Sequence, residues 1–348
     1  MNGGEALVRQ LRAEGVDTVF ALPGVQIMAA FDALYDARAD IRMIHVRHEQ
    51  ATTYMADGYA RVSGKPGVAM VVPGPGALNA TAGLGTAYAS GSPVLLISGQ
   101  IPTDSLGKQQ GQLHEVEDQL DVFRPITKWA HRVTRVEEIP EAVHEAFRQL
   151  TTGRPRPVEL EVPPDTLANL GDADIIEPEE YPPAAVRALE IARAVQILTE
   201  AERPAIVAGG GALSSGVGAE ILELARMLQA PVMTTQTSKG VIDESEPYHV
   251  GTNYVGLGPA ERVLADTDVL LAVGTRLSFR QASVESMPRI IQIDADPDEI
   301  GRNMDVELGI NADAKVALGQ VVAQLRSAGV SKPSRMEKIE GYRKAFKD

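Results

Sequence analysis

The sequence predicts an α/β protein made of two three-layer α/β/α domains, each with a mainly parallel sheet. Short apolar runs alternate with helical patterns along the chain, and glycine-containing turns follow several of the runs. The apolar runs are continuous rather than alternating with polar residues, which is typical of parallel strands covered on both faces. A length of 348 residues exceeds one ordinary domain, so we expect two.

The composition is that of an average globular protein, at 44% hydrophobic and 23% charged residues. A net charge of −14 argues against nucleic acid and anionic membrane surfaces as partners. The sequence has no cysteine, which excludes disulfides, thiolate metal ligands and a cysteine nucleophile. We find neither a secretory signal nor an apolar run of the ~18 residues that a membrane span needs, so we expect a cytoplasmic enzyme.

The first elements alternate in order. A helix is expected over 5–14, where apolar residues recur on one side and Gly15 follows. A buried strand over 18–22 comes next, then a turn at Pro23-Gly24 and a helix over 27–35.

Glu49 lies between a predicted strand, 43–46, and a predicted helix that ends at Gly64. In an open α/β sheet, ligands bind at the carboxyl ends of the strands. A carboxylate at this corner faces the positive end of the helix dipole, so we expect it to stay ionised. The alternative is an acidic residue in a first helical turn with no further role, since such residues are common there.

A second strand, 68–72, leads into Pro73-Gly74-Pro75-Gly76 and then Asn79. This turn lacks the Gly-Lys-Ser/Thr ending of a P-loop. Its glycines would allow the backbone to approach a flat ligand closely. The alternative is an ordinary strand-to-helix turn capped by Asn79.

Further along come a third strand over 93–100, the polar loop Gln109 to Glu115, which contains His114, and the segment Thr127-Lys128-Trp129. In this order, these residues resemble the pyrimidine-binding domain of thiamine-diphosphate enzymes of the acetolactate synthase type. The resemblance implies that Glu49 hydrogen-bonds N1′ of the aminopyrimidine and activates the cofactor, and that His114 acts at the reacting centre. Several relatives carry glutamine where His114 stands. The residues implied to lie on the pyrimidine side are Pro23, Gly24, Glu49, Pro73, Asn79 and Gln112.

The same resemblance implies a 2-keto acid substrate and a homodimer or homotetramer, because the site of this family lies between two chains. It also implies Mg²⁺, bound with the diphosphate by a third domain whose signature is Gly-Asp-Gly. We find no Gly-Asp-Gly in the sequence. We therefore expect the diphosphate site to lie on a missing domain or on a separate chain, and we favour a truncated sequence over a separate chain. We also expect this chain to be inactive by itself.

In the second half, a helix is expected over 188–200, a strand over 204–208, a helix over 217–228 and a strand over 231–234. Two more strands, over 269–273 and 290–293, are also expected. These segments resemble the central domain of the same family, which holds FAD in some members, an adenine nucleotide in others and nothing in many. The residues implied as nucleotide contacts are Arg154, Gly209, Gly210, Gly211, Thr235, Gly274, Thr275, Arg276, Asp294 and Asp296.

Two other functions compete with a catalytic role. One is a non-catalytic FAD- or ADP-binding, or regulatory, subunit with the same fold. An NAD-dependent dehydrogenase is disfavoured, because Thr234 and Thr235 stand where an acidic ribose ligand is needed. The expected domains are a thiamine-diphosphate pyrimidine-binding domain over 1–165, a Pro- and acid-rich linker over 166–183, a Rossmann-like central domain over 184–330 and a connector over 331–348.

Overall fold

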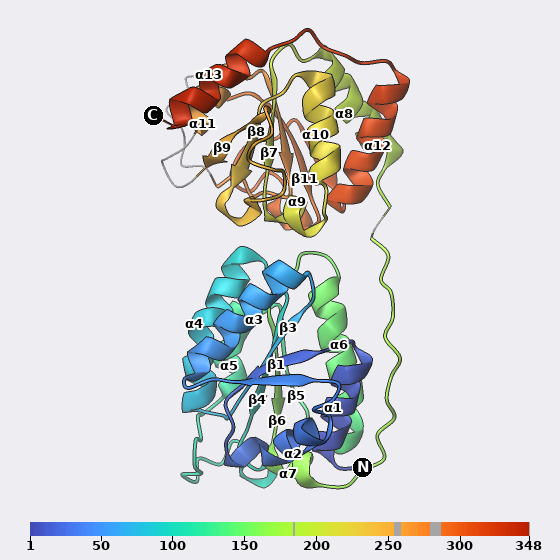
Figure 1. The fold of residues 1–348 in the computed structure, drawn as a ribbon. Helices are drawn as coiled ribbons and strands as arrows, with labels where there is room; N and C mark the ends of the chain where they lie inside the picture. Colours follow the sequence, from blue (N-terminus) through green and yellow to red (C-terminus); the bar gives the residue numbers. More distant parts are fainter. Residues whose placement is uncertain (184, 254–258, 279–286, 348) are drawn as a thin grey trace. The chain divides into compact units, whose positions relative to one another are not determined.

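The structure is a computed structural model that describes residues 1–183, 185–253, 259–278 and 287–347. The chain forms two compact units, Met1–Tyr181 and Pro182–Asp348, which we call the N-terminal and C-terminal units (Figure 1). Each unit contains a six-stranded sheet, and the neighbouring strands of both sheets pair in parallel. The predicted α/β class with mainly parallel sheets is confirmed.

The N-terminal sheet has the strand order β2-β1-β3-β4-β6-β5. Its strands are β1 Thr18–Ala21, β2 Arg42–His45, β3 Gly67–Val71, β4 Val94–Gly99, β5 Trp129–Arg132 and β6 Val158–Val162. The helices of this unit are α1 Gly3–Ala13, α2 Met28–Asp36, α3 Glu49–Ser63, α4 Pro75–Ser90, α5 Gln119–Phe123, α6 Ile139–Thr151 and α7 Pro164–Ala168. We did not predict β5, α5 and α7 from the sequence. Strands β1 to β4 and helices α1 to α3 lie within a few residues of their predicted bounds, and α6 and β6 correspond to a helix and a strand that the sequence predicts over 139–150 and 158–162.

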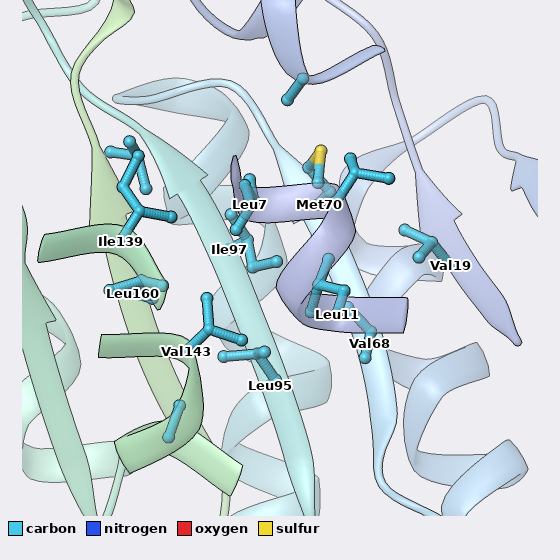
Figure 2. Packing of buried hydrophobic residues seen from close by; sticks show 14 of the residues in the cluster. Leu7, Leu11, Val19, Val68, Met70, Leu95, Ile97, Ile139, Val143 and Leu160 are labelled. Atoms are coloured by element: carbon cyan, nitrogen blue, oxygen red, sulfur yellow. The ribbon is translucent and has the colours of Figure 1, made fainter. Parts of the chain in front are cut away.

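Successive residues of the central strands pack on opposite faces of this sheet. On one face, Val68 and Ile97 contact side chains of α1 and α6 (Figure 2). On the other face, Ala69 and Leu96 pack against α3, α4 and Phe123 of α5. Both faces are therefore buried, which is why these strands read as continuous apolar runs.

The strand order reverses direction between β1 and β3. The chain leaves β1 toward β2 on one side of the sheet and leaves β3 toward β4 on the other. The two connections diverge at the carboxyl ends of β1 and β3, and this switch point is where open α/β sheets usually bind their ligands. The turns that begin at Leu22 and Val72 follow these two strands, and Glu49 follows the neighbouring strand β2.

The segment expected as a linker is largely attached to the N-terminal unit. Leu170 forms an isolated bridge with Asn2. The Ile176 backbone exchanges two 2.9 Å hydrogen bonds with the Gln10 side chain. Compact packing of this unit therefore extends to Tyr181.

The C-terminal sheet has the order β12-β11-β10-β7-β8-β9. Its strands are β7 Pro204–Ala208, β8 Val232–Thr235, β9 His249–Asn253, β10 Val269–Val273, β11 Arg289–Asp294 and β12 Leu308–Asn311. Its helices are α8 Ala188–Glu200, α9 Gly210–Ser214, α10 Gly218–Leu228, α11 Ala260–Ala265, α12 Ala314–Ser327 and α13 Met336–Lys347. We did not predict β9, α9, α11, β12 and α12. The expected connector contains α13, which buries Ile339 and Tyr342 in the core of this unit. None of the helices in the described ranges is long and apolar enough to cross a membrane.

Candidate active site

Glu49 is the first residue of α3, directly after the residue that caps the helix. His48 is the N-cap, and its Nδ1 accepts a hydrogen bond from the backbone N–H of Gln50 at 3.2 Å. The predicted placement of Glu49, in a first helical turn just past a strand, is therefore confirmed. Its side chain is neither fully buried nor fully exposed.

The Glu49 carboxylate is held by one oxygen. Asn79 Nδ2 donates to Glu49 Oε2 at 3.0 Å. No residue in the described ranges donates a hydrogen bond to Oε1, and a Cβ added at Gly76 would lie 3.5 Å from that oxygen. The carboxylate thus keeps one oxygen available for a ligand that can donate a hydrogen bond.

Asn79 does not cap its helix, contrary to the alternative that we considered from the sequence. Helix α4 begins at Pro75, and its N-cap Gly74 makes no side-chain capping bond. Asn79 lies one turn further along and reaches across to α3. A cap would have tied this side chain to its own backbone, whereas its observed partner is 30 residues away.

Glycines in the turn after β1 and in the turn after β3 allow these two turns to lie close to each other and to the loop that contains His114. A Cβ on Gly24 would clash with Val72 Cγ1, and one on Gly76 would lie 2.5 Å from Val72 Cγ2. Gly74 has a φ of +56°, and its added Cβ would lie 3.0 Å from the Cα of His114. These glycines are therefore required by packing within the protein, in addition to any closeness to a ligand.

His114 is oriented by Gln26, a residue that the sequence analysis did not single out. Gln26 is 8% exposed, and its Nε2 lies 3.3 Å from both Leu113 O and His114 Nδ1. Because an amide nitrogen can only donate, Nδ1 is the acceptor, and neutral His114 carries its proton on Nε2. A polar residue two positions after Pro23-Gly24 was the available signal, but a single glutamine is not distinctive in a sequence.

The loop around His114 is held by its own acidic residue. The Glu115 carboxylate accepts the backbone N–H of Gly111 at 2.6 Å and of Gln112 at 2.9 Å. Gln112 Nε2 donates to Ser105 Oγ at 3.1 Å. The structure thus brings Glu49 and Asn79 together, joins the His114 loop to Gly74, and directs Gln112 to Ser105. Pro23 is exposed in the turn after β1, and Pro73 is buried.

In the C-terminal unit, the strand order reverses between β7 and β10. The glycine turns that follow these strands contact each other: Gly209 N donates to Val273 O at 2.8 Å and Gly211 N to Gly274 O at 3.0 Å. A Cβ on Gly274, whose φ is +57°, would lie 2.5 Å from Ala212 N. Backbone packing thus accounts for Gly209, Gly211 and Gly274. Gly210 begins α9.

The polar residues expected at a nucleotide also have local partners. Thr235 caps a short 3₁₀ turn. Thr275 Oγ1 accepts from Leu277 N at 3.2 Å. Asp294 and Asp296 each accept the backbone N–H two residues later, at 3.0 and 3.1 Å. The remaining expected contacts are Arg276, whose carbonyl accepts from Asn303, and Arg154, which lies in the N-terminal unit before β6.

No group of three or more His, Asp or Glu side chains suited to a metal ion occurs among the residues that the structure describes.

Comparison with known protein families gives two matches, one in each unit. The profile described as "Thiamine pyrophosphate enzyme, N-terminal TPP binding domain" matches residues 1–122. The profile described as "Thiamine pyrophosphate enzyme, central domain" matches residues 191–321.

Among curated proteins, the "Probable acetolactate synthase large subunit" of Methanocaldococcus jannaschii is 40% identical over 99% of this chain and 60% of its own length. The "Acetolactate synthase" of Arthrospira platensis is 35% identical over 92% of the chain and 58% of its own length. The "Probable 2-ketoarginine decarboxylase AruI" of Pseudomonas aeruginosa is 36% identical over 93% of the chain and 58% of its own length. The chain thus spans about 60% of the length of these relatives. Since two domains of one family follow each other along the sequence and similar proteins match it almost throughout, the chain belongs to the thiamine pyrophosphate enzymes.

Proposed function

We propose that this chain is the N-terminal and central part of a thiamine-diphosphate-dependent 2-keto acid decarboxylase or carboligase, similar to acetolactate synthase, with Glu49 as the activating carboxylate. One observation carries the proposal. Asn79 holds one Glu49 oxygen, and the other is available at the carboxyl edge of a parallel sheet beside its switch point. A carboxylate oxygen in this position could accept a hydrogen bond from a ring nitrogen of a ligand bound at this edge of the sheet.

Thiamine diphosphate, when bound, supplies the nucleophilic carbon and the electron sink for decarboxylation. The protein residues bind it and adjust its protonation. With the cofactor bound, Glu49 Oε1 would accept a hydrogen bond from the pyrimidine nitrogen N1′ in its protonated form, because the unprotonated nitrogen has no hydrogen to donate. Such a charge-assisted bond is about twice as strong as a neutral one. Asn79 keeps Oε2 occupied, which would leave Oε1 as the oxygen that accepts from the ring.

His114 is the second functional residue of the proposal. Its Nδ1 accepts from Gln26, so its Nε2–H is free to donate to a substrate carboxylate or carbonyl. A histidine is also able to release and recover a proton near neutral pH. We assign it the orientation of the 2-keto acid and proton donation to the product.

The names of the relatives support the substrate class, because one of them is described as a 2-ketoarginine decarboxylase and others as acetolactate synthases. We propose that the diphosphate and Mg²⁺ are held by a further domain or a separate chain, within a homodimer or homotetramer. Large apolar side chains near the Glu49 edge are well exposed, which supports assembly there; they are Val25, Met28, Tyr54, Met55, Leu78 and Leu113.

The non-catalytic nucleotide-binding alternative lacks a comparable observation. The glycines expected to approach FAD or ADP instead pack against one another's backbone. The acidic residues expected to bind the ribose accept hydrogen bonds from their own turns.

The test replaces Glu49 by glutamine in the intact protein, supplied with whatever domain or chain completes the site. Glu49→Gln should lower turnover of a 2-keto acid by about a hundredfold or more, with an unchanged circular dichroism spectrum. Glu141→Gln is the matched control, because Glu141 is likewise an acidic residue in the first turn of a helix, and it is exposed to solvent. Equal activity of the two variants would show that Glu49 is only an acidic helix start.

A further inference from the structure

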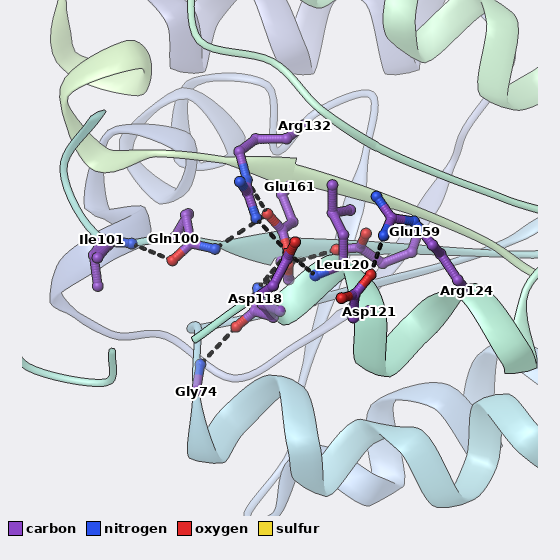
Figure 3. Close-up of polar contacts among 12 residues, drawn as sticks. Gly74, Gln100, Ile101, Asp118, Leu120, Asp121, Arg124, Arg132, Glu159 and Glu161 are labelled. Atoms are coloured by element: carbon purple, nitrogen blue, oxygen red, sulfur yellow. Dashed lines mark hydrogen bonds and ion pairs between the residues drawn. The ribbon is translucent and has the colours of Figure 1, made fainter. Parts of the chain in front are cut away.

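The loop that contains Pro73 and Gly74 is anchored by a buried glutamine outside the expected site. Gln119 is the first residue of α5 and has no exposed surface. Its Oε1 accepts the backbone N–H of Gly74 at 2.7 Å, across 45 residues of sequence. Figure 3 shows this bond to Gly74 at the edge of a larger polar network.

The other end of the Gln119 amide is fully engaged. Its Nε2 lies 3.0 Å from Ser98 Oγ, 3.0 Å from Gly99 O and 3.1 Å from Glu161 Oε1. Gly99 O and the Glu161 carboxylate can only accept hydrogen bonds, so the nitrogen must face them and the oxygen must face Gly74. The amide therefore has one orientation that satisfies its neighbours.

Two buried glutamates of β6 form the base of this network. Glu159 and Glu161 have no exposed surface. Arg132 Nε donates to Glu161 Oε2 at 2.5 Å and Gln100 Nε2 donates to the same oxygen at 3.1 Å (Figure 3). Burial, together with the nearby charge of Glu161, raises the pKa of Glu159 well above its usual range. Arg132 opposes the rise of the Glu161 pKa that burial causes, so we assign the charge of the pair to Glu161.

Gly74 depends on this anchor. It is buried, it has a φ of +56°, and it precedes the first residue of α4 without a side-chain cap. A buried backbone N–H that loses its partner is costly. Without Gln119, the turn from β3 to α4 would have to move to pair this group.

We propose that Gln119 is a positioning residue for the cofactor, which holds the Pro73–Gly74 turn against the thiamine pyrimidine without touching it. This inference rests on the proposed function, since that function places the pyrimidine at this turn. The buried side chains of β4 and β6, together with the partly exposed Arg132 of β5, are the rigid support through which Gln119 acts. Thiamine affinity should therefore respond to Gln119, while the KM for the keto acid should not.

The experiment titrates the intact protein with thiamine diphosphate and Mg²⁺ by calorimetry and measures keto acid turnover in parallel. Gln119→Leu should bind thiamine diphosphate roughly tenfold more weakly, as expected for loss of one buried hydrogen bond. Its KM for the keto acid should stay within about twofold of the parent value, which is a smaller change than the loss of one hydrogen bond would cause. Gln10→Leu is the matched control: Gln10 is equally buried and binds the backbone of Ile176, outside the expected site.

Gln119→Glu is a second variant, of nearly the same shape. Its carboxylate would lie beside Glu161, which Gln119 Nε2 contacts in the parent protein. The other charged or titratable groups of the network are Glu159, which is linked through Ser98, and Arg132 and Asp118, which are linked through Glu161. When ionised, the introduced carboxylate repels Glu161 and donates no hydrogen bond, whereas its protonated form donates again. The loss of thiamine affinity relative to the parent protein should thus be larger at pH 8 than at pH 6. If Gln119 only stabilised the fold, a folded Gln119→Glu variant would bind thiamine diphosphate with the same relative affinity at both pH values.

The outcomes separate the two proposals. If the parent protein binds no thiamine diphosphate, the proposed function fails, and the role of Gln119 fails with it. If the parent protein binds and both Gln119 variants bind equally well at every pH, only the positioning role is overturned. If Gln119→Leu does not fold, the pH dependence of Gln119→Glu decides. The inference is overturned if the ratio of its thiamine diphosphate dissociation constant to that of the parent protein does not change with pH.

Discussion

The contact between α3 and α4 sets the distance between Glu49 and Asn79, and Gly83 makes this contact close. A Cβ added at Gly83 would clash with Thr53 Oγ1 and lie 2.7 Å from Tyr54 N and 2.9 Å from Thr53 C. Two of these three atoms belong to the backbone of α3, so they cannot move without moving the helix. Thr53 and Gly83 each lie one helical turn after Glu49 and Asn79, respectively.

Gly83→Ala should therefore push the two helices apart. The alanine gains about 1 kcal/mol of helix propensity over glycine, and overpacking against backbone costs about 1–3 kcal/mol. Gly85→Ala gains the same propensity without the clash, because nothing lies within 4 Å of its added Cβ. The two variants should thus differ in free energy of unfolding by about 1–3 kcal/mol, with Gly85→Ala the more stable.

The same displacement should lengthen the 3.0 Å bond from Asn79 to Glu49. Misplacement of a catalytic group by about 1 Å costs up to a hundredfold in rate, so Gly83→Ala should lose about tenfold to a hundredfold in turnover. Urea unfolding and keto acid turnover of both variants measure the two effects. Equal stability and equal activity of Gly83→Ala and Gly85→Ala would refute the view that the α3–α4 contact positions Glu49.

Two other predictions concern stability. Because the pKa of Glu159 is raised in the folded protein, its contribution to stability is present below the unfolded-state pKa of about 4.3 and is lost as the pH rises toward the folded-state pKa. Glu159→Gln should therefore gain stability relative to the parent by up to about 1.4 kcal/mol per pH unit over that window, measured by urea unfolding at several pH values; a constant difference would contradict a protonated Glu159. Gly274→Ala should destabilise the C-terminal unit by at least about 1 kcal/mol, because of its positive φ and the 2.5 Å approach to Ala212 N. Gly319→Ala, whose added Cβ meets nothing within 4 Å, should not destabilise it, and thermal unfolding compares the two.

Most of the strands and most of the longer helices could be predicted because their signals are local. The run over 204–208 is apolar at every position, and β7 covers the same residues. The helix over 188–200 matches α8 at both ends. Short elements such as α5 and α11 were missed, because five or six residues carry too little periodicity to distinguish them from a loop.

The sequence by itself determined the fold class, the two-part organisation of the chain and the position of Glu49 at a strand-to-helix corner. These follow from periodicity and turn chemistry, which neighbouring residues encode together. Only the tertiary structure decided which side chains meet. Asn79 bonds Glu49 rather than its own helix, Gln119 bonds Gly74, and the two glutamates of the alternating strand Val158–Val162 face a buried network instead of solvent. Such pairs depend on how helices and strands far apart in sequence pack against each other, and no local pattern specifies that packing.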